Sequence, residues 1–317
     1  MPHATEAARR AILGAMKAVA ATGGTPSTLD QQAIAGAARF VFGMPGGFDA
    51  DALPALGPEA LANALPSNLA DDAVRFLTVM TLVDGTLDKA KVAAVVRYAA
   101  ALGIHERFLG DMVAAARDRL GEALADMTRA NMESITGKPW AGGDVTRWLV
   151  PYADGHADPA LAARFDALSA LPVASFGHSF WTHFRESGYA FPGNPAALNA
   201  AFSLPHDSAH VLTGYDTTPR GEILVSTFTA SMHKILPMAG HVLPVLLTWH
   251  VGVRLNDVAG DAHDTLDPTE FWHAWAAGAA ATVDTFAPDW DFWRYVNEPL
   301  VALRERWSIP IGGVEAS

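Results

Sequence analysis

The sequence predicts an all-α protein that consists of two helical domains. In the first half, apolar residues recur every three or four positions, which is the spacing of one face of a helix. No part of that half alternates in the two-residue pattern of a strand. Half of the 317 residues are hydrophobic and only 18% are charged, so the chain can bury an extensive core.

Tryptophan and charge divide the chain near residue 136. All nine tryptophans lie at or beyond Trp140. Residues 1–136 carry 12 basic and 15 acidic side chains, a net charge of −3, whereas residues 137–317 carry 10 and 19, a net charge of −9. We therefore expect a first domain over 1–136, a linker over 137–149 that contains most of the run TGKPWAGG, and a second domain over 150–317.

The composition excludes several classes of protein. Without cysteine, the chain has no disulfide scaffold, thiolate metal site or cysteine nucleophile. A net charge of −12 argues against binding to nucleic acid. Residues 1–22 contain Glu6 and Lys17 and fit a short amphipathic helix better than a signal peptide, so we expect a cytoplasmic protein.

Apolar stripes mark the expected helices of the first half. Residues 29–42 form an amphipathic candidate. Further along, Asp88 can cap a helix that Gly103 ends. The three stripes in this region consist of Ala73, Phe76, Leu77, Met80 and Val83; of Val92, Val95, Val96, Ala99 and Leu102; and of Leu109, Met112, Val113, Ala116 and Leu120.

The segment Phe76–Ile104 resembles the tellurite-resistance TerB-like helical domain, and the resemblance covers about residues 55–135. Such domains often carry an acidic pair around an Asp-Gly turn and a glutamate that opens the next helix. Asp84 and Asp88 match the pair, but Lys91 stands at the glutamate position. An ammonium group there opposes a cation, so we expect this region to serve in packing or partner docking.

The second half contains a set of potential metal ligands. His206 and His210 are separated by four residues, which places both imidazoles on one face of a helix. Asp207 borders that face. Ser203 and Pro205 suit the start of this helix, because proline is tolerated where its missing amide would lack a partner.

A second helix can return a carboxylate to the two histidines. Gly214 can end the first helix, and Thr218 can cap the next one with Pro219 at its first position. Glu222 then lies in the first turn. Two imidazoles and one or two carboxylates suit zinc, and also accept iron, manganese or magnesium. The alternative is a pair of hydrogen-bonded histidines on a helix surface.

The pattern His206, Asp207, His210, eleven residues and Glu222 resembles the signature of the coenzyme Q biosynthesis protein 4 family. The flanks also match, with HVLTGY at 210–215 and Gly221 before the glutamate. Other similar segments are Leu171-Pro172, Phe176–His178, Phe271–Thr282, Pro299-Leu300 and Arg304. The resemblance therefore spans about residues 150–317.

This resemblance implies an all-helical fold, a divalent metal held by His206, Asp207, His210 and Glu222, and a hydrophobic tunnel for a prenyl chain. It also implies a role in ubiquinone formation, through removal of the C1 carboxylate of a prenylated benzoate-type precursor, with hydroxylation. Ser208 and Ala209 are smaller than the residues usual there, which widens the space beside the metal.

Several further residues are candidates for chemistry or substrate binding. Asp207 can act as a ligand, as an orienter of an imidazole or as a general base, and His206 joins it as a catalytic candidate. Tyr215, His241 and Arg304 are candidates for substrate contact. Their structural alternatives are turn formation, a hydrogen-bonded core histidine and a helix-end ion pair.

Two other functions fit the same residues. One is a non-catalytic carrier or scaffold for isoprenoid lipids and quinone-biosynthesis enzymes, with a structural metal. The other is a zinc hydrolase, if His-Asp-x-x-His replaces His-Glu-x-x-His. We also expect a homo-oligomer and peripheral membrane contact. The apolar segment Ile235–Val253 is long enough to span a membrane, but its prolines and histidines favour an interrupted buried helix.

Overall fold

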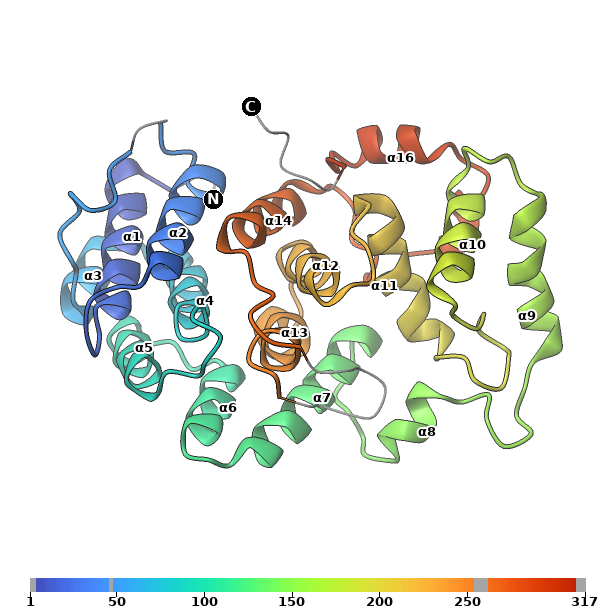
Figure 1. Cartoon of the computed structure of the whole chain (residues 1–317), viewed down its shortest axis with the longest axis horizontal. Coiled ribbons are helices and arrows are strands. Elements are labelled where there is room, and N and C mark those ends of the chain that lie inside the picture. The colour runs from blue at the N-terminus through green and yellow to red at the C-terminus, as the bar shows by residue number, and fades with distance from the viewer. Residues whose placement is uncertain (1–3, 46–47, 254–261, 312–317) are drawn as a thin grey trace.

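The computed structural model describes residues 4–45, 48–253 and 262–311, and within them the chain is helical with no strand. This confirms the predicted all-α class. Figure 1 shows the amino-terminal helices at one end, helices α9, α10 and α11 at the other, and helices α12, α13 and α14 between them.

The described part of the amino-terminal half contains seven α-helices, one short π-helix and one 3-10 turn. In chain order they are α1 (Glu6–Ala20), α2 (Thr28–Gly36), the π-helix η1 (Ala37–Val41), α3 (Pro58–Ala64), the 3-10 turn η2 (Ser67–Leu69), α4 (Ala70–Val79), α5 (Lys89–Leu102), α6 (Arg107–Ala116) and α7 (Leu120–Thr136).

The carboxyl-terminal half is also helical throughout its regular elements. They are α8 (Val145–Leu149), α9 (Pro159–Asp166), the 3-10 turn η3 (Ala167–Ala170), α10 (Phe176–Ser187), α11 (Ala200–Thr213), α12 (Pro219–Met232), the π-helix η4 (Met238–Val242), α13 (Leu243–Trp249), α14 (Pro268–Ala280), α15 (Phe292–Tyr295) and α16 (Leu300–Arg306).

Local sequence signals place several helix ends correctly. Asp88 accepts hydrogen bonds from the amides of Ala90 and Lys91 at the start of α5, and Gly103 ends that helix with a φ of 70°. Three details differ from prediction. Helix α4 ends at Val79, so Val83 of the first stripe lies beyond it. Val96 is 36% exposed. Leu120 belongs to α7, because Asp118 turns the chain with a φ of 62° before the third stripe is complete.

The larger hydrophobic core crosses the predicted domain boundary. Phe76 of α4 packs edge-on against Trp272 and Trp275 of α14, with ring centroids 5.0 and 5.5 Å away. Residues of η4 and α13 join the same core. The boundary at residue 136 stays a prediction, but α12, α13 and α14 of the second half share this core with the amino-terminal helices.

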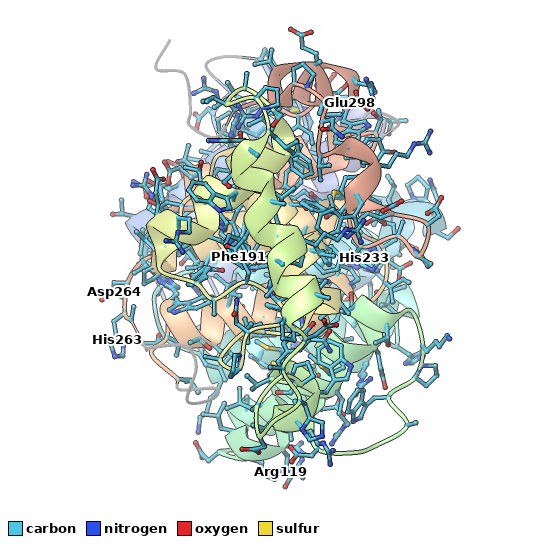
Figure 2. The ribbon with its side chains drawn as sticks, turned by 90° about the vertical axis from the view of Figure 1, so that its right-hand side faces the viewer. Arg119, Phe191, His233, His263, Asp264 and Glu298 are labelled. Carbon is cyan, nitrogen blue, oxygen red and sulfur yellow. The ribbon has the colours of Figure 1, made fainter. Side chains whose placement is uncertain are left out.

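A second, smaller core lies among α9, α10, α11, α12 and the carboxyl-terminal helices. It is rich in phenylalanine, and Phe165 stacks on Phe180 and Phe191 within it. Figure 2 labels Phe191 on the side of the molecule that carries this core. The predicted linker contains α8, where Trp148 meets Trp140 edge-on.

The apolar segment Ile235–Val253 forms η4 and the seven-residue helix α13, with Pro244 in the first turn of α13. No helix among the described residues is long and apolar enough to cross a membrane.

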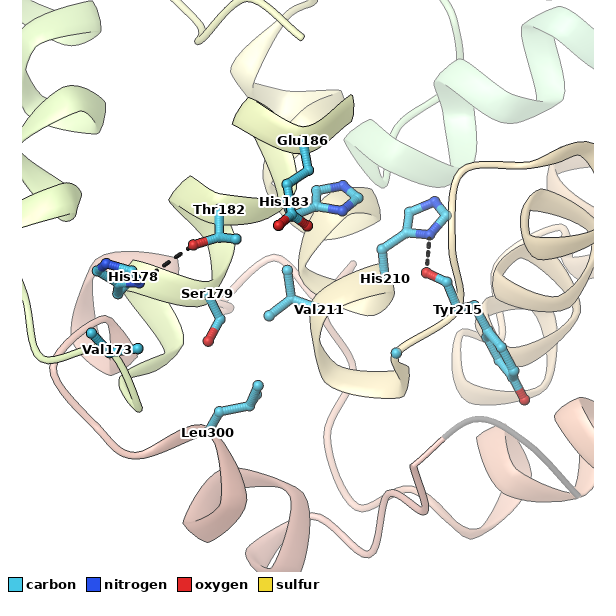
Figure 3. Close-up of a pocket in the computed structure, with 11 residues that line it drawn as sticks. Val173, His178, Ser179, Thr182, His183, Glu186, His210, Val211, Tyr215 and Leu300 are labelled. Carbon is cyan, nitrogen blue, oxygen red and sulfur yellow. Dashed lines mark hydrogen bonds between the residues drawn. The ribbon is translucent and has the colours of Figure 1, made fainter. Parts of the chain in front are cut away.

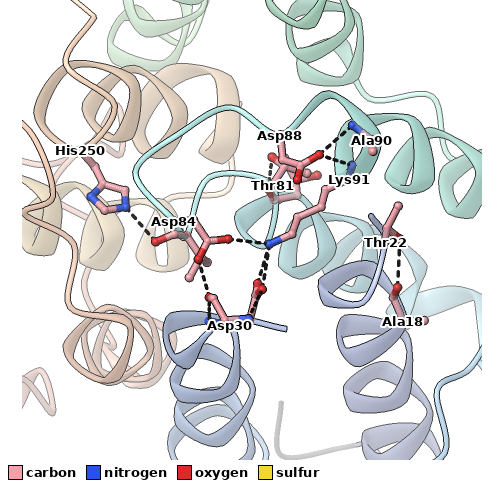
Figure 4. Close-up of polar contacts among 12 residues, drawn as sticks. Ala18, Thr22, Asp30, Thr81, Asp84, Asp88, Ala90, Lys91 and His250 are labelled. Carbon is pink, nitrogen blue, oxygen red and sulfur yellow. Dashed lines mark hydrogen bonds and ion pairs between the residues drawn. The ribbon is translucent and has the colours of Figure 1, made fainter. Parts of the chain in front are cut away.

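A buried ion cluster joins the amino-terminal helices, as Figure 4 shows. The ammonium of Lys91 contacts both carboxylate oxygens of Asp30 at 2.7 and 3.0 Å and one oxygen of Asp84 at 2.8 Å. Lys91 and Asp30 are 3% and 1% exposed. Lys91 therefore supplies the positive charge between these acidic groups.

Candidate metal centre

Helices α11 and α12 form the hairpin that carries the candidate ligands. Gly214 ends α11 with a φ of 80°, and Thr218 caps α12, whose first residue is Pro219, as the sequence predicts. The predicted start of α11 was wrong. Asn199 caps the helix through the amide of Ala201, so Pro205 lies inside it and removes one amide from its hydrogen-bond ladder.

Three side chains of this hairpin place a ligand atom in one small space. The Nε2 atoms of His206 and His210 lie 3.2 Å apart. One oxygen of Glu222 is 3.3 Å from Nε2 of His206, and its other oxygen is 3.5 Å from Nε2 of His210. Among the described residues, these three form a group with all ligand atoms within 4.8 Å of one another.

The two imidazole nitrogens stand near the separation expected on a tetrahedral ion. Zinc binds imidazole nitrogen and carboxylate oxygen at about 2.0–2.2 Å, so two ligand atoms on one tetrahedral ion stand about 3.3–3.6 Å apart. The two nitrogens are 3.2 Å apart. The two distances to Glu222 join different oxygens of its carboxylate, and one atom from each of the three residues lies within 4.8 Å of the others. Two nitrogens and one oxygen are also a donor set that zinc accepts. The residues present therefore fit a divalent metal with at least one position open.

A backbone carbonyl orients His210. Its Nδ1 lies 2.9 Å from the carbonyl oxygen of Tyr215, just beyond the turn that ends α11. A carbonyl only accepts, so Nδ1 carries a proton, and Nε2 is the nitrogen that faces the group. Metal-binding histidines commonly have such a partner on the other ring nitrogen.

The charges of the three side chains support one another. Burial alone would lower the pKa of His206, but the hydrogen bond to Glu222 raises it above its ordinary value. Burial alone would raise the pKa of Glu222, but the two histidines hold it well below its usual range. A proton on His206 and a metal ion therefore compete for the same carboxylate.

The carboxylate of Asp207 contacts His183, a partner that the sequence analysis did not identify. Its Oδ1 lies 3.0 Å from Nε2 of His183 on α10, and both side chains are largely buried. The His183 ring also stacks on His210, with centroids 5.3 Å apart and planes at 24°. Tyr189 meets His183 edge-on at 6.2 Å. A role of Asp207 as metal ligand or catalytic residue stays a prediction.

The nearest sequence signal for this pairing was weak. His183 follows the resembling segment Phe176–His178 by five residues, and it is 24 positions from Asp207. Only the packing of α10 against α11 brings the two side chains together.

An open groove of about 350 Å³ lies beside the centre, between α10, α11 and the start of α16. His183, Glu186 and His210 line one end, and Val173 and Leu300 line the other, with His178 beside Val173 (Figure 3). His210 therefore belongs both to the group of ligand atoms and to the wall of the groove. The volume lies within the usual range for small-molecule pockets.

The three substrate candidates lie in different places. Tyr215 borders the groove, but its ring points away from His210 (Figure 3). Arg304 donates from Nε and Nη2 to the carbonyls of Leu212 and Val211, at the end of α11. His241 is buried in η4, with Nε2 at 2.7 Å from Oγ of Ser134. Substrate contact by these residues stays a prediction.

Comparisons with known proteins add little to this geometry. No protein-family model matches the chain, and no curated protein matches it. One solved structure that resembles it is a Nostoc punctiforme protein provisionally assigned to ubiquinone biosynthesis. It has 19% identity, covers 63% of this chain and 92% of its own, and gives a TM-score of 0.33. A score of this size does not establish a common fold, so the functional argument rests on the residues of the site.

Proposed function

We propose that this protein is a metal-dependent enzyme that removes the C1 carboxylate of a prenylated hydroxybenzoate-type precursor in the formation of a ubiquinone-like quinone. One observation carries the proposal. The ligand atoms of His206, His210 and Glu222 lie within 4.8 Å of one another, with the two imidazole nitrogens 3.2 Å apart, beside a groove that His210 also lines. The sequence resemblance of the same residues supplies the reaction and the substrate class.

Zinc is the metal that the donor set suits best, with iron, manganese and magnesium as alternatives. When bound, the metal would supply a positive charge that stabilises negative charge developing on the ring as carbon dioxide leaves. His206, His210 and Glu222 would hold it. The Tyr215 carbonyl fixes the tautomer of His210, and the Asp207–His183 pair supports the other side of that ring. Three protein ligands leave a position open, as in catalytic sites.

The groove suits a head group that is polar on one side and carries an apolar chain. An aromatic acid would lie with its carboxylate toward His183 and His210, and its chain toward Val173 and Leu300. The chain would then leave over Val173 and Val301, which are 78% and 59% exposed. The Leu300 amide donates a hydrogen bond to the Ala174 carbonyl, which holds the segments that carry Val173 and Val301 side by side.

Metal content and turnover test the proposal together. Wild-type protein, Glu222→Ala and the exposed control Glu305→Ala would be assayed for bound metal and for carbon dioxide from a prenylated hydroxybenzoate. We expect metal and turnover in the wild type and the control, and loss of both in Glu222→Ala. If wild type and Glu222→Ala both keep metal and neither turns over, the enzyme proposal fails and the lipid carrier remains. Cleavage of a peptide or ester would favour the hydrolase.

Peripheral membrane contact belongs to the same proposal, because a prenylated substrate resides in a bilayer. The second half carries a charge of −9, so attraction to anionic lipid cannot drive binding. The exposed Val173 and Val301 offer an apolar contact instead. Flotation with vesicles should therefore be insensitive to salt and should weaken in Val173→Ser. Binding that salt abolishes would contradict an apolar mode of docking.

A further inference from the structure

A buried polar stripe runs along α12, away from the candidate metal centre. Glu222, Ser226 and Thr229 are spaced four and three residues apart and lie on one face of α12, and His233, the residue that caps the end of this helix, follows four residues later. Ser226, Thr229 and His233 are 6%, 1% and 2% exposed. At 1.5 Å per residue, the stripe spans about 16 Å. Polar side chains so deeply buried need hydrogen-bond partners.

The far end of the stripe reaches the surface through Asp284. Nδ1 of His233 lies 2.8 Å from Oδ2 of Asp284, whose side chain is 31% exposed. The other oxygen of Asp284 accepts from the amide of Phe286, which fixes the carboxylate in place. Figure 2 labels His233 on the face that it shows. His233 therefore connects a surface carboxylate with the interior.

Two polar atoms of the stripe face the interior without a partner. Nε2 of His233 and Oγ1 of Thr229 are buried, and neither has a hydrogen-bond partner among the described residues. They lie one helical turn apart, because the His233 amide donates to the Thr229 carbonyl at 2.7 Å. A water molecule between such atoms is the usual way in which proteins satisfy them.

A neutral histidine and an irregular backbone segment lie beside this stripe. His241 meets His233 edge-on at 6.0 Å, and its Nε2 is occupied by Ser134. Burial, followed by the nearby His233 and His206, lowers the pKa of His241 to about 3, so His241 stays neutral. The backbone here is unusual, since Leu236 has a φ of 49° just before the π-helix η4. Strain and π-helices cluster at functional sites.

We propose that Asp284, His233, Thr229 and Ser226 form a proton path from the surface to the candidate metal centre, with a bound water between His233 and Thr229. The role of this path in the reaction rests on the proposed function. When carbon dioxide leaves the ring, the carbon keeps the bonding electron pair and must take up one proton, so each turnover consumes one proton. A substrate in the groove covers His183 and His210, and the stripe on α12 stays open to solvent at Asp284.

Nuclear magnetic resonance of the full-length protein with ¹⁵N-labelled histidine tests the path without any assay of activity. We expect Nε2 of His233 to show magnetisation exchange with a bound water in the wild type. Thr229→Val should abolish that signal, because it removes the second partner of the water. Thr227→Val is the matched control, since the Thr227 hydroxyl binds the Ile223 carbonyl on another face of α12. Absence of exchange in the wild type, or its persistence in Thr229→Val, would overturn the proposal.

Turnover with added buffer tests the role of the path in the reaction. We expect His233→Gln and Thr229→Val to slow decarboxylation by roughly 10²-fold, and imidazole in solution to restore much of the rate. Thr227→Val should turn over like the wild type. Unchanged turnover in both path variants would refute the catalytic role. If the wild type does not turn over, the proposed function fails, and the water signal at His233 still decides whether the path exists.

Discussion

Oδ1 of Asp207 is hydrogen-bonded to Nε2 of His183 at 3.0 Å, and this bond connects α11 with α10. Asp207 stands next to His206 in the sequence, but its carboxylate takes this partner on the neighbouring helix. His183 in turn stacks on His210. The Asp207–His183 pair therefore packs against the ring of His210, one of the proposed ligands.

This arrangement predicts different effects for the two carboxylates of the motif. Glu222→Gln should abolish metal binding at micromolar metal, because it removes one of three donors. Asp207→Asn should keep the metal and weaken its affinity by about 10–100-fold, which is typical for residues that orient a ligand. Isothermal titration with zinc measures both. Equal loss in the two variants would instead make Asp207 a direct ligand.

Gly278 allows α14 to pack closely on α12. A Cβ atom at this position would overlap the Phe228 carbonyl oxygen and Oγ of Ser231. Gly278→Ala should therefore lower the free energy of unfolding by about 1–3 kcal/mol or more, through overpacking. Gly110→Ala on α6 is the control, because its Cβ would meet nothing within 4 Å. That substitution should be neutral or stabilise the helix by about 0.5–1 kcal/mol. Chemical denaturation distinguishes the two, and equal effects would contradict the close approach.

Lys91 should be essential for the stability of the amino-terminal helices. Lys91→Met would leave the carboxylate of Asp30 buried without its cation, which should cost about 3–5 kcal/mol. Lys89→Met on the same helix breaks only the exposed pair with Asp118 and should cost less than about 1 kcal/mol. Thermal unfolding of the two variants measures the difference. A Lys91→Met protein as stable as the Lys89→Met protein would show that the buried pair adds nothing.

The buried carboxyl group of Asp111 should make the folded protein less stable at neutral pH than at acidic pH. Burial, followed by the nearby Asp126, raises the pKa of Asp111 to about 7, and one of its oxygens has no partner among the described residues. The unfolded carboxyl titrates near 3.9, so the folded form binds the extra proton and loses stability as the pH rises from about 4 to 7.

The variant Asp111→Asn mimics the protonated carboxyl and can still donate to Asp126. It should remove this fall and stabilise the protein by about 1–3 kcal/mol at pH 8. Unfolding by urea at pH 5 and pH 8 provides the measurement. A variant that shows the same dependence on pH as the wild type would assign the fall to another group.

Local signals in the sequence were sufficient for much of the hairpin. The spacing of His206 and His210, the left-handed Gly214 and the Thr218 cap each depend on residues within one or two turns. The same holds for Asp88 and Gly103 around α5. These features could be predicted because their physical causes are local.

Features that depend on tertiary packing could not be predicted in this way. His183 meets Asp207 only because α10 lies against α11, and Phe76 meets Trp272 across 196 residues. Pro205 is tolerated inside α11, where its position alone indicated a helix start. The sequence indicated that the ammonium of Lys91 opposes a bound cation. It could not identify the partner of Lys91, because Asp30 is 61 residues away.

X-ray absorption of the purified, metal-loaded protein is the sharpest test of the metal centre. We expect about one zinc ion per chain, bound at about 2.0–2.2 Å by two imidazoles and by oxygen donors, and loss of this spectrum in Glu222→Ala. A wild-type protein that takes up no metal, or whose metal has no imidazole ligand, would contradict the assignment of His206, His210 and Glu222 as a metal centre.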